Sequence, residues 1–297
     1  MAAVQGAFSA LLAPGLRKVF FQRYDSMPEV YSRVYNVLSS TRKYEDDQGI
    51  TGFGVIPEKT ESAAIQYEDP VQAYTKRYTH LIYGLGFRVS EQMYRNDQYR
   101  VMSRMSNAFG KSTRHTVETV AAAVYNDGFA DTGPDAVSLF NTAHPLKHGG
   151  TSANHPTTDA DLSVASLEAA VTAFRNMRDD NNIRIAVKPT VLLVSPSDEF
   201  TALKILQSTN EPWVMTNTKN VIANRGIAPV VWDYLTDADA WYLLAPNDDR
   251  EFNFFWRLRP RFANSDDFDT GDAKYKVNME FSCGYSDWRG AYGTSGG

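Results

Sequence analysis

The sequence has few of the features that mark secreted or membrane proteins. Cys283 is the only cysteine among 297 residues, so the chain cannot form an internal disulfide and a reducing compartment is expected. The N-terminus has no basic stretch ahead of an apolar segment, which argues against a secretory signal. No apolar run approaches the roughly 20 residues that span a bilayer. We therefore expect a soluble protein made in a cytoplasm.

The chain also lacks an excess of positive charge. It carries 30 Lys and Arg residues against 35 Asp and Glu residues, a formal net charge of -5. A general DNA-binding protein needs a cationic face that displaces counterions from phosphates, so this charge balance disfavours that class. Charged residues make up 22% and hydrophobic residues 43% of the chain, which is ordinary for a globular protein and excludes a disordered chain.

Nucleotide-binding motifs are incomplete. A phosphate-binding loop ending at Gly110 and Lys111 would need a glycine at position 105, which is Met105, and the segment reads as helix. A dinucleotide fingerprint that starts at Gly84 fails because position 89 is Val89. We therefore predict no cofactor.

Metal and nucleophile motifs are incomplete as well. His144 and His148 are four residues apart, but proline and glycine around them argue against a helix and no cysteine or carboxylate set completes a zinc site. The acidic run 266–272 has glycine at the sixth position of a calcium loop, but Val277 stands where glutamate is required. No Gly-x-Ser-x-Gly sequence occurs. We predict an ordered polar loop, a charged turn, and no catalytic or metal residue.

The first part of the chain contains segments that cannot bury their own side chains. Residues 1–50 mix extended and short-helical segments without a core of their own. Residues 51–88 hold strand-forming residues punctuated by glycine and proline, which predicts a long two-stranded excursion. Because a lone hairpin is marginally stable in water, we expect neighbouring chains to support both segments.

One long helix is predicted over residues 90–127. Ser90 can cap its N-terminus, Gly128 can stop its C-terminus, and apolar residues recur at i, i+3 and i+4 spacing between them. Gly110 is the expected point of a bend. At 1.5 Å a residue the helix would be about 55 Å long. We expect it to lie across one domain, because no heptad pattern is sustained.

The rest of the chain predicts an α/β unit followed by alternating strands. The apolar run 190–194 predicts a buried strand, with a helix after it and further strands at 230–232 and 241–244. From residue 277 to 285 apolar and polar residues alternate, which indicates a half-buried strand that pairs with 252–259. The tail beyond residue 290 is small and polar.

This order of parts resembles the major capsid proteins of tailed phages with the Hong Kong 97-type fold, particularly the Mu-like major head subunit family. Two local stretches are similar to that family: SLFNTAHP at 138–145 followed by GGTSAN at 149–154, and KYKVNMEFSCGYSDWRG at 274–290. The resemblance implies an α+β fold. Its parts would be an N-terminal arm at 1–50, an extended loop at 51–88, a peripheral domain at 89–187 and 246–297 with its spine helix at 90–127, and an axial domain at 188–245.

The function that this resemblance implies is structural and not enzymatic. The chain would be a major capsid subunit that forms pentamers and hexamers of an icosahedral shell, enclosing packaged double-stranded DNA non-specifically in the virion. Assembly would take place in the host bacterial cytoplasm, with no membrane and no cofactor. Implied partners are further copies, a portal and, in some relatives, a decoration protein. Because the sequence begins directly with the arm at Met1, a separate scaffold or protease-scaffold is expected.

Two segments of opposite charge suggest how copies of the chain meet. Between residues 45 and 69 acidic residues far outnumber the single lysine, whereas arginines predominate between residues 88 and 118. We predict that the hairpin of one subunit lies across the long helix of a neighbour and that these charges help to set the register. The alternative is two solvated faces. The predicted contact residues are Glu58, Glu61, Glu68 and Asp69 on the hairpin and Arg95, Arg100 and Arg104 on the helix.

Two other functions stay open from the sequence. A non-viral, encapsulin-like protein compartment would share the fold but would need a cargo-binding inner face. A cytoplasmic α/β enzyme of unrecognised family would be a stable monomer with a ligand pocket. Particle formation separates both shell functions from the enzyme.

Overall fold

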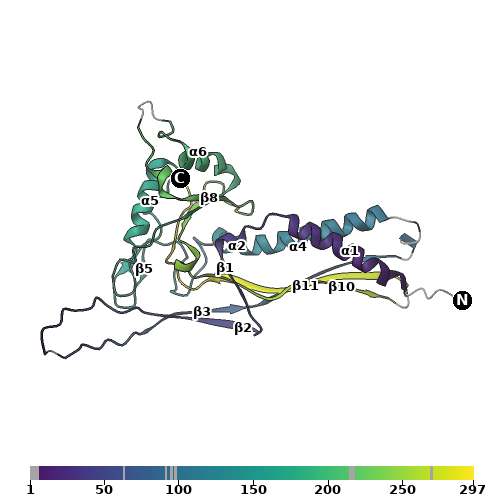
Figure 1. Ribbon diagram of the computed structural model, residues 1–297, viewed down its shortest axis with the longest axis horizontal. Helices are drawn as coiled ribbons and strands as arrows, with labels where there is room; N and C mark the ends of the chain where they lie inside the picture. The colour runs from purple at the N-terminus through teal and green to yellow at the C-terminus, as the bar shows by residue number, and fades with distance from the viewer. Residues whose placement is uncertain are drawn as a thin grey trace.

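The computed structural model describes residues 7–62, 64–90, 92–93, 96, 99–213, 218–267 and 270–297. Helices lie along a long β-sheet, a smaller lobe stands beside them, and a hairpin extends below the lobe (Figure 1). No helix of the described residues is long and apolar enough to cross a membrane. The helices are α1 (Ala7–Ser26), α2 (Tyr31–Val34), α4 (Tyr99–Asn126), α5 (Val164–Asn176) and α6 (Glu199–Gln207).

The longest strands form a four-stranded sheet in the order β1-β10-β11-β4. Alternate residues of β11 are buried, and in its register with β10 Phe254 lies opposite Cys283 and Trp256 opposite Phe281. The predicted pairing of these two segments is therefore confirmed. The strands of this sheet are β1 (Asn36–Ser39), β4 (Leu81–Val89), β10 (Phe252–Asp266) and β11 (Ala273–Tyr285).

The hairpin differs from the predicted two-stranded excursion over 51–88. Its paired strands are β2 (Tyr44–Ile50) and β3 (Gln72–Thr79), while the described residues between them form no strand. The strand that follows His80 leaves the hairpin, and β4 pairs with β11 about two hundred positions later in the chain. The strand-forming residues were recognised correctly, but composition does not identify a partner so distant along the chain.

The long helix covers one face of this sheet. It begins at Tyr99 within the described residues, later than the predicted 90–127, and Asn96 lies in a turn before it. Its end is as predicted, because the backbone N–H of Gly128 donates to the carbonyl oxygen of Tyr125 just after the last helical residue. Ser90 caps a short turn instead, accepting a hydrogen bond from the N–H of Met93 at 3.3 Å.

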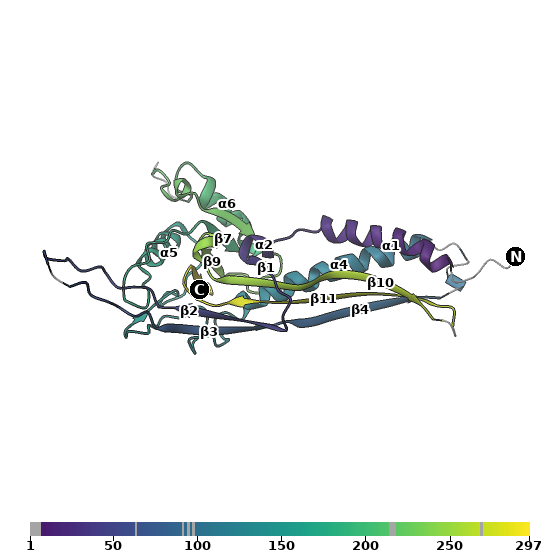
Figure 2. The same ribbon diagram turned by 60° about the horizontal axis from the view of Figure 1, so that its bottom comes forward.

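The N-terminal segment corrects another expectation. Most of residues 1–50 was expected to be extended or short-helical without a core, but α1 is a 20-residue helix that lies beside α4 (Figure 2). Leu16, Phe20 and Tyr24, spaced four residues apart, pack with α4 and the sheet in a second hydrophobic cluster. Pro14 lies inside this helix, and burial of the apolar stripe supports α1.

The small lobe contains a second sheet in the order β12-β9-β7-β8, with α5 and α6 beside it. Three of its strands confirm the predicted α/β unit. The fourth, β12, comes from the C-terminal tail expected to be only small and polar, and all four of its residues are buried. The lobe's strands are β7 (Val191–Val194), β8 (Ala228–Val231), β9 (Trp241–Leu244) and β12 (Ala291–Thr294), and a separate two-stranded ladder joins β5 (His144–Pro145) to β6 (Thr151–Ser152).

Candidate assembly surfaces

The loop of the hairpin, residues 51–71, exposes a set of large apolar side chains. We call these residues the hairpin tip. Ile56 and Tyr67 are 91% and 92% exposed, and their apolar neighbours are exposed by more than half. Scattered single apolar residues are normal on a surface, but so many in one loop mark an interaction site. The exposed members are Phe53, Val55, Ile56, Ile65 and Tyr67.

The predicted acidic contact residues lie on the same tip. Glu58, Glu61, Glu68 and Asp69 are all exposed. One of them also has a local role, because the Glu68 carboxylate accepts a hydrogen bond of 2.8 Å from the backbone N–H of Gly54 across the loop. The tip therefore presents apolar side chains and negative charge together.

The base of the hairpin is fastened to the body by a buried polar network. The Asp47 carboxylate of β2 accepts hydrogen bonds from the Asn253 amide at 3.0 Å and from the Ser286 hydroxyl. The Tyr78 hydroxyl of β3 lies 2.7 Å from the Ser286 hydroxyl, and its ring packs on Phe255. Burial raises the pKa of Tyr78, so its hydroxyl stays protonated and can donate. The base is thus held firmly, and a further hydrogen bond of 2.7 Å from the Asn181 amide to the Gly52 carbonyl holds the start of the tip.

The predicted partners on the long helix are separate from the hairpin within one chain. Arg104 is exposed on α4, whereas Arg95 and the side chain of Arg100 lie outside the described residues. The hairpin tip lies at one end of the molecule and points away from α4, which extends toward the other end (Figures 1 and 2). A contact between the acidic tip and the helix therefore requires a second copy of the chain.

A second basic surface, which the sequence analysis missed, lies on the long sheet. Arg88 of β4 is opposite Lys274 of β11, and Lys276 is opposite Gly86, so these cations share one face. Here a groove of about 610 Å³ runs along the strands. Arg88 and Lys274 each pair with an aspartate of the turn after β10, at Asp272 and Asp267. The alternating pattern of β11 could have indicated this basic surface, because Lys274 and Lys276 occupy its polar positions.

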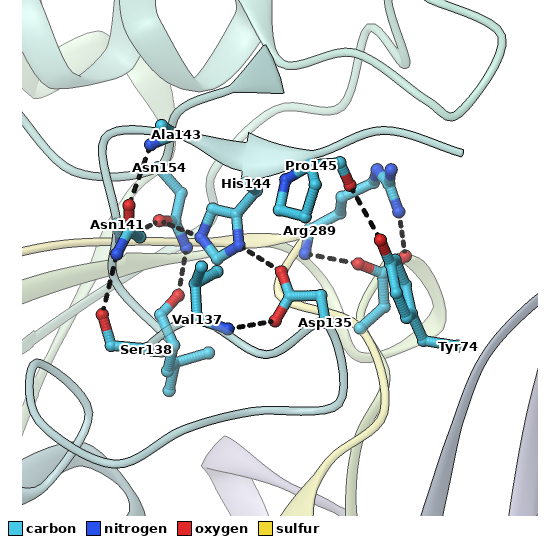
Figure 3. Close-up of polar contacts among 12 residues, drawn as sticks. Tyr74, Asp135, Val137, Ser138, Asn141, Ala143, His144, Pro145, Asn154 and Arg289 are labelled. Atoms are coloured by element: carbon cyan, nitrogen blue, oxygen red, sulfur yellow. Dashed lines mark hydrogen bonds and ion pairs between the residues drawn. The ribbon is translucent and has the colours of Figure 1, made fainter. Parts of the chain in front are cut away.

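The histidine loop, with its short zinc-like spacing, is a buried hydrogen-bond network (Figure 3). His144 is fully buried, with Nδ1 2.6 Å from an Asp135 carboxylate oxygen and Nε2 2.9 Å from the Asn154 side-chain oxygen. The Asn154 amide donates to the Leu139 carbonyl at 2.7 Å, which fixes its orientation. The ring also stacks on Trp288 with 4.1 Å between centroids. Both ring nitrogens are used, so His144 ties the loop together and offers no free nitrogen.

Other reactive side chains in the described residues have structural surroundings. No group of three His, Cys, Asp or Glu side chains there could hold a metal ion. Burial raises the pKa of the Cys283 thiol to about 12, and its Sγ lies 3.5 Å from the Val120 carbonyl oxygen. Such a thiol is not an activated nucleophile. Cys283 therefore has a structural position between β11 and the long helix.

Comparison with known proteins places the chain in a family. The model of a phage capsid protein family matches residues 73–293, and no curated protein matches the sequence significantly. In the procapsid of bacteriophage JBD30, a subunit 16% identical has a TM-score of 0.53, over 97% of this chain and 75% of that one. A subunit of a virus-like particle from Pyrococcus furiosus is 11% identical, with a TM-score of 0.57 over 95% of this chain and 98% of that one. A subunit from the capsid of the native GTA particle is 10% identical, with a TM-score of 0.55 over 90% of each chain.

At such low identities the solved structures show a shared mixed α and β capsid fold. Membership rests on the family model, which spans most of the chain from the hairpin's second strand to β12. Proteins of this family are structural and not enzymes. The chain therefore belongs to the phage capsid protein family and is a structural subunit of a capsid shell.

Proposed function

We propose that this chain is the major head subunit of a Mu-like tailed phage with a Hong Kong 97-type fold. Its copies form pentamers and hexamers of an icosahedral shell around packaged double-stranded DNA. The observation that carries the proposal is the hairpin tip, whose large apolar side chains and acids are exposed to solvent. Such a surface is stabilised only when another chain covers it.

The assembly itself is the first test. The purified full chain is expected to form particles of megadalton mass in size-exclusion chromatography and negative-stain microscopy. A variant in which residues 53–68 are replaced by two glycines removes the apolar tip but keeps both strands, so we expect a folded subunit that forms no shells. Circular dichroism controls for the fold. A wild-type chain that stays monomeric across salt and concentration would refute the shell function.

The hairpin contacts are the second part of the proposal. Glu58, Glu61, Glu68 and Asp69 of one copy lie near basic residues of a neighbour. These are either the predicted set Arg95, Arg100 and Arg104, or the cations of the sheet groove around Lys276. Exposed ion pairs contribute only about 0–1 kcal/mol each, so the charges act together and set register more than strength.

Charge reversal separates these two receiving surfaces. We expect Arg104→Glu to slow assembly and to weaken its dependence on salt if the helix receives the hairpin, because exposed charges are screened by salt. Lys276→Glu is expected to slow assembly and weaken its salt dependence if the sheet groove receives the hairpin. Arg104→Lys keeps the charge and is the matched control. Light-scattering kinetics between low and high salt measure the effect; unchanged salt dependence in both reversed variants contradicts the charge pairing.

The remaining partners follow from a shell that is filled with DNA. We expect three further partners: a portal, a separate scaffold or protease-scaffold, and a decoration protein. Assembly is expected to take place in the host bacterial cytoplasm. The capsid of bacteriophage JBD30 is decorated with minor capsid protein trimers, and a subunit of it has a TM-score of 0.54 to this chain. The net charge of -5 suits a wall that encloses DNA without binding it tightly.

A protein compartment that encloses other cargo is the second candidate. The chain shares its fold with a virus-like particle from Pyrococcus furiosus over nearly the whole of both chains, and one shell fold can serve either function. The contents of particles from their native source distinguish the two. Nuclease-protected double-stranded DNA supports the phage head, and a protein cargo without DNA supports the compartment.

A further inference from the structure

Three arginines converge in the small lobe without an acidic partner. Arg175 in the last turn of α5, Arg184 in the segment before β7, and Arg225 at the end of the short helix before β8 line a pocket of about 350 Å³. The other lining residues carry no charge. All three arginines are exposed, and in the described part of the chain none of them forms an ion pair. We call this site the arginine pocket.

The same lobe carries three carboxylates that form no ion pair among the described residues. Asp198 is the N-cap residue of α6, Asp239 precedes β9, and Asp161 precedes the Ser163 cap of α5. Burial raises the pKa of Asp198, and the charges of Asp239 and Asp161 raise it further, while no cation contributes to lowering it. We call these three residues the aspartate cluster.

The two groups lie at opposite ends of the lobe. In the register of the sheet, Val191 pairs with Ala228 at the end from which the arginines extend, and Val194 pairs with Trp241 at the end next to the aspartates. Helix α5 runs between them, with Asp161 before its first turn and Arg175 in its last. Its 13 residues span about 20 Å. The groups are therefore too far apart to neutralise each other within one chain, since the screening length is about 8 Å at physiological salt.

Two complementary patches at opposite ends of one subunit fit a head-to-tail contact. An interface that uses different surfaces on each side closes into a ring when the rotation between copies allows it. We propose that the arginine pocket of one copy receives the aspartate cluster of the next copy around a capsomer. Arginine suits this task because its guanidinium binds carboxylates through paired hydrogen bonds. This inference rests on the proposed shell function and names the residues that close each ring.

The test uses two reversed variants of the full chain. One carries Arg184→Glu and Arg225→Glu, and the other carries Asp161→Lys and Asp239→Lys. Each variant alone places like charges at every ring contact, so we expect each to need at least about tenfold more protein for assembly than the wild type. In a mixture, the reversed pocket of one variant can face the reversed cluster of the other, which pairs opposite charges. At the next contact an unreversed arginine pocket faces an unreversed aspartate cluster, as in the wild type. Alternation of the two variants pairs opposite charges at every contact of a hexamer and at all but one contact of a pentamer. We therefore expect the mixture to assemble at a lower protein concentration than either variant alone, into particles that contain both variants.

Controls keep this result separate from the fold and from the proposed function. Lys188→Glu reverses an exposed cation of the lobe outside the pocket and is expected to assemble like the wild type. Thermal unfolding of each unassembled variant checks that it folds. Folded variants that assemble normally alone, or whose mixture is not rescued, overturn the ring contact but leave the shell function standing. A wild type that never assembles overturns the shell function instead.

Discussion

Replacing Glu118 with glutamine is expected to lower the free energy of unfolding by about 2–4 kcal/mol. Glu118 is fully buried in α4, and its carboxylate accepts three hydrogen bonds. One oxygen accepts from the backbone N–H of Val30 at 3.1 Å, and the other from the N–H of Tyr31 at 3.2 Å and the Trp232 indole N–H at 2.9 Å. This one side chain joins the long helix, the segment after α1 and the small lobe.

The effect is large because glutamine cannot accept at both positions. A carboxylate only accepts, whereas a glutamine amide turns an NH₂ group toward at least one of the three donors. A buried donor left without an acceptor costs about 1–3 kcal/mol, and more when its lost partner was charged. Burial raises the pKa of Glu118, and the three donors together with Arg114 oppose that rise.

Urea unfolding of the unassembled subunit measures this change. Glu168→Gln on the exposed side of α5 makes the same chemical change on the surface and is the matched control, with an expected change within about 0.5 kcal/mol. An equal midpoint for the two variants would show that the buried network contributes nothing. Glu118→Leu removes both acceptor oxygens, leaves all three donors without a partner, and should be less stable than Glu118→Gln.

The second large effect is expected from Gly110→Ala, where α1 crosses α4. A Cβ atom at Gly110 would lie 2.6 Å from the carbonyl oxygen of Phe20 and 3.3 Å from the backbone nitrogen of Tyr24. Backbone atoms cannot move aside as a flexible side chain can, so the helices must separate. Phe20 would then lose its packing against Phe109 and Phe262, whose rings lie 5.7 and 5.3 Å away. We expect a loss of about 1–3 kcal/mol.

Gly15→Ala is the matched control because it makes the same substitution inside α1. Nothing lies within 4 Å of a Cβ atom at Gly15. Alanine stabilises a helix by about 1 kcal/mol relative to glycine when no clash opposes it. The two variants are therefore expected to change the free energy of unfolding with opposite signs, and hydrogen exchange should show α1 loosened only by Gly110→Ala. A stabilising Gly110→Ala would refute the close crossing.

Much of the candidate surface could be predicted from the sequence, because charge is a property of composition. The acids of the hairpin tip are exposed as expected, and Arg104 is exposed on its helix. The receiving surface is less visible in the sequence. Lys274 and Lys276 sit within a strand, and only its pairing with β4 brings Arg88 to the same face. The arginine pocket joins residues from three separate segments, so no local motif marks it.

The sequence by itself determined the local elements whose periodicity is unambiguous: the alternating pair β10 and β11, the long stripe of α4 and the apolar strand β7. It also excluded disulfides within the chain and disfavoured a general DNA-binding role. Only the tertiary structure decided that α1 is a docked helix, that β4 leaves the hairpin for β11, and that the polar tail completes the lobe as β12. The physical reason is that periodicity reports which face of an element is buried, whereas the partner that buries it is chosen by packing between segments far apart in the chain.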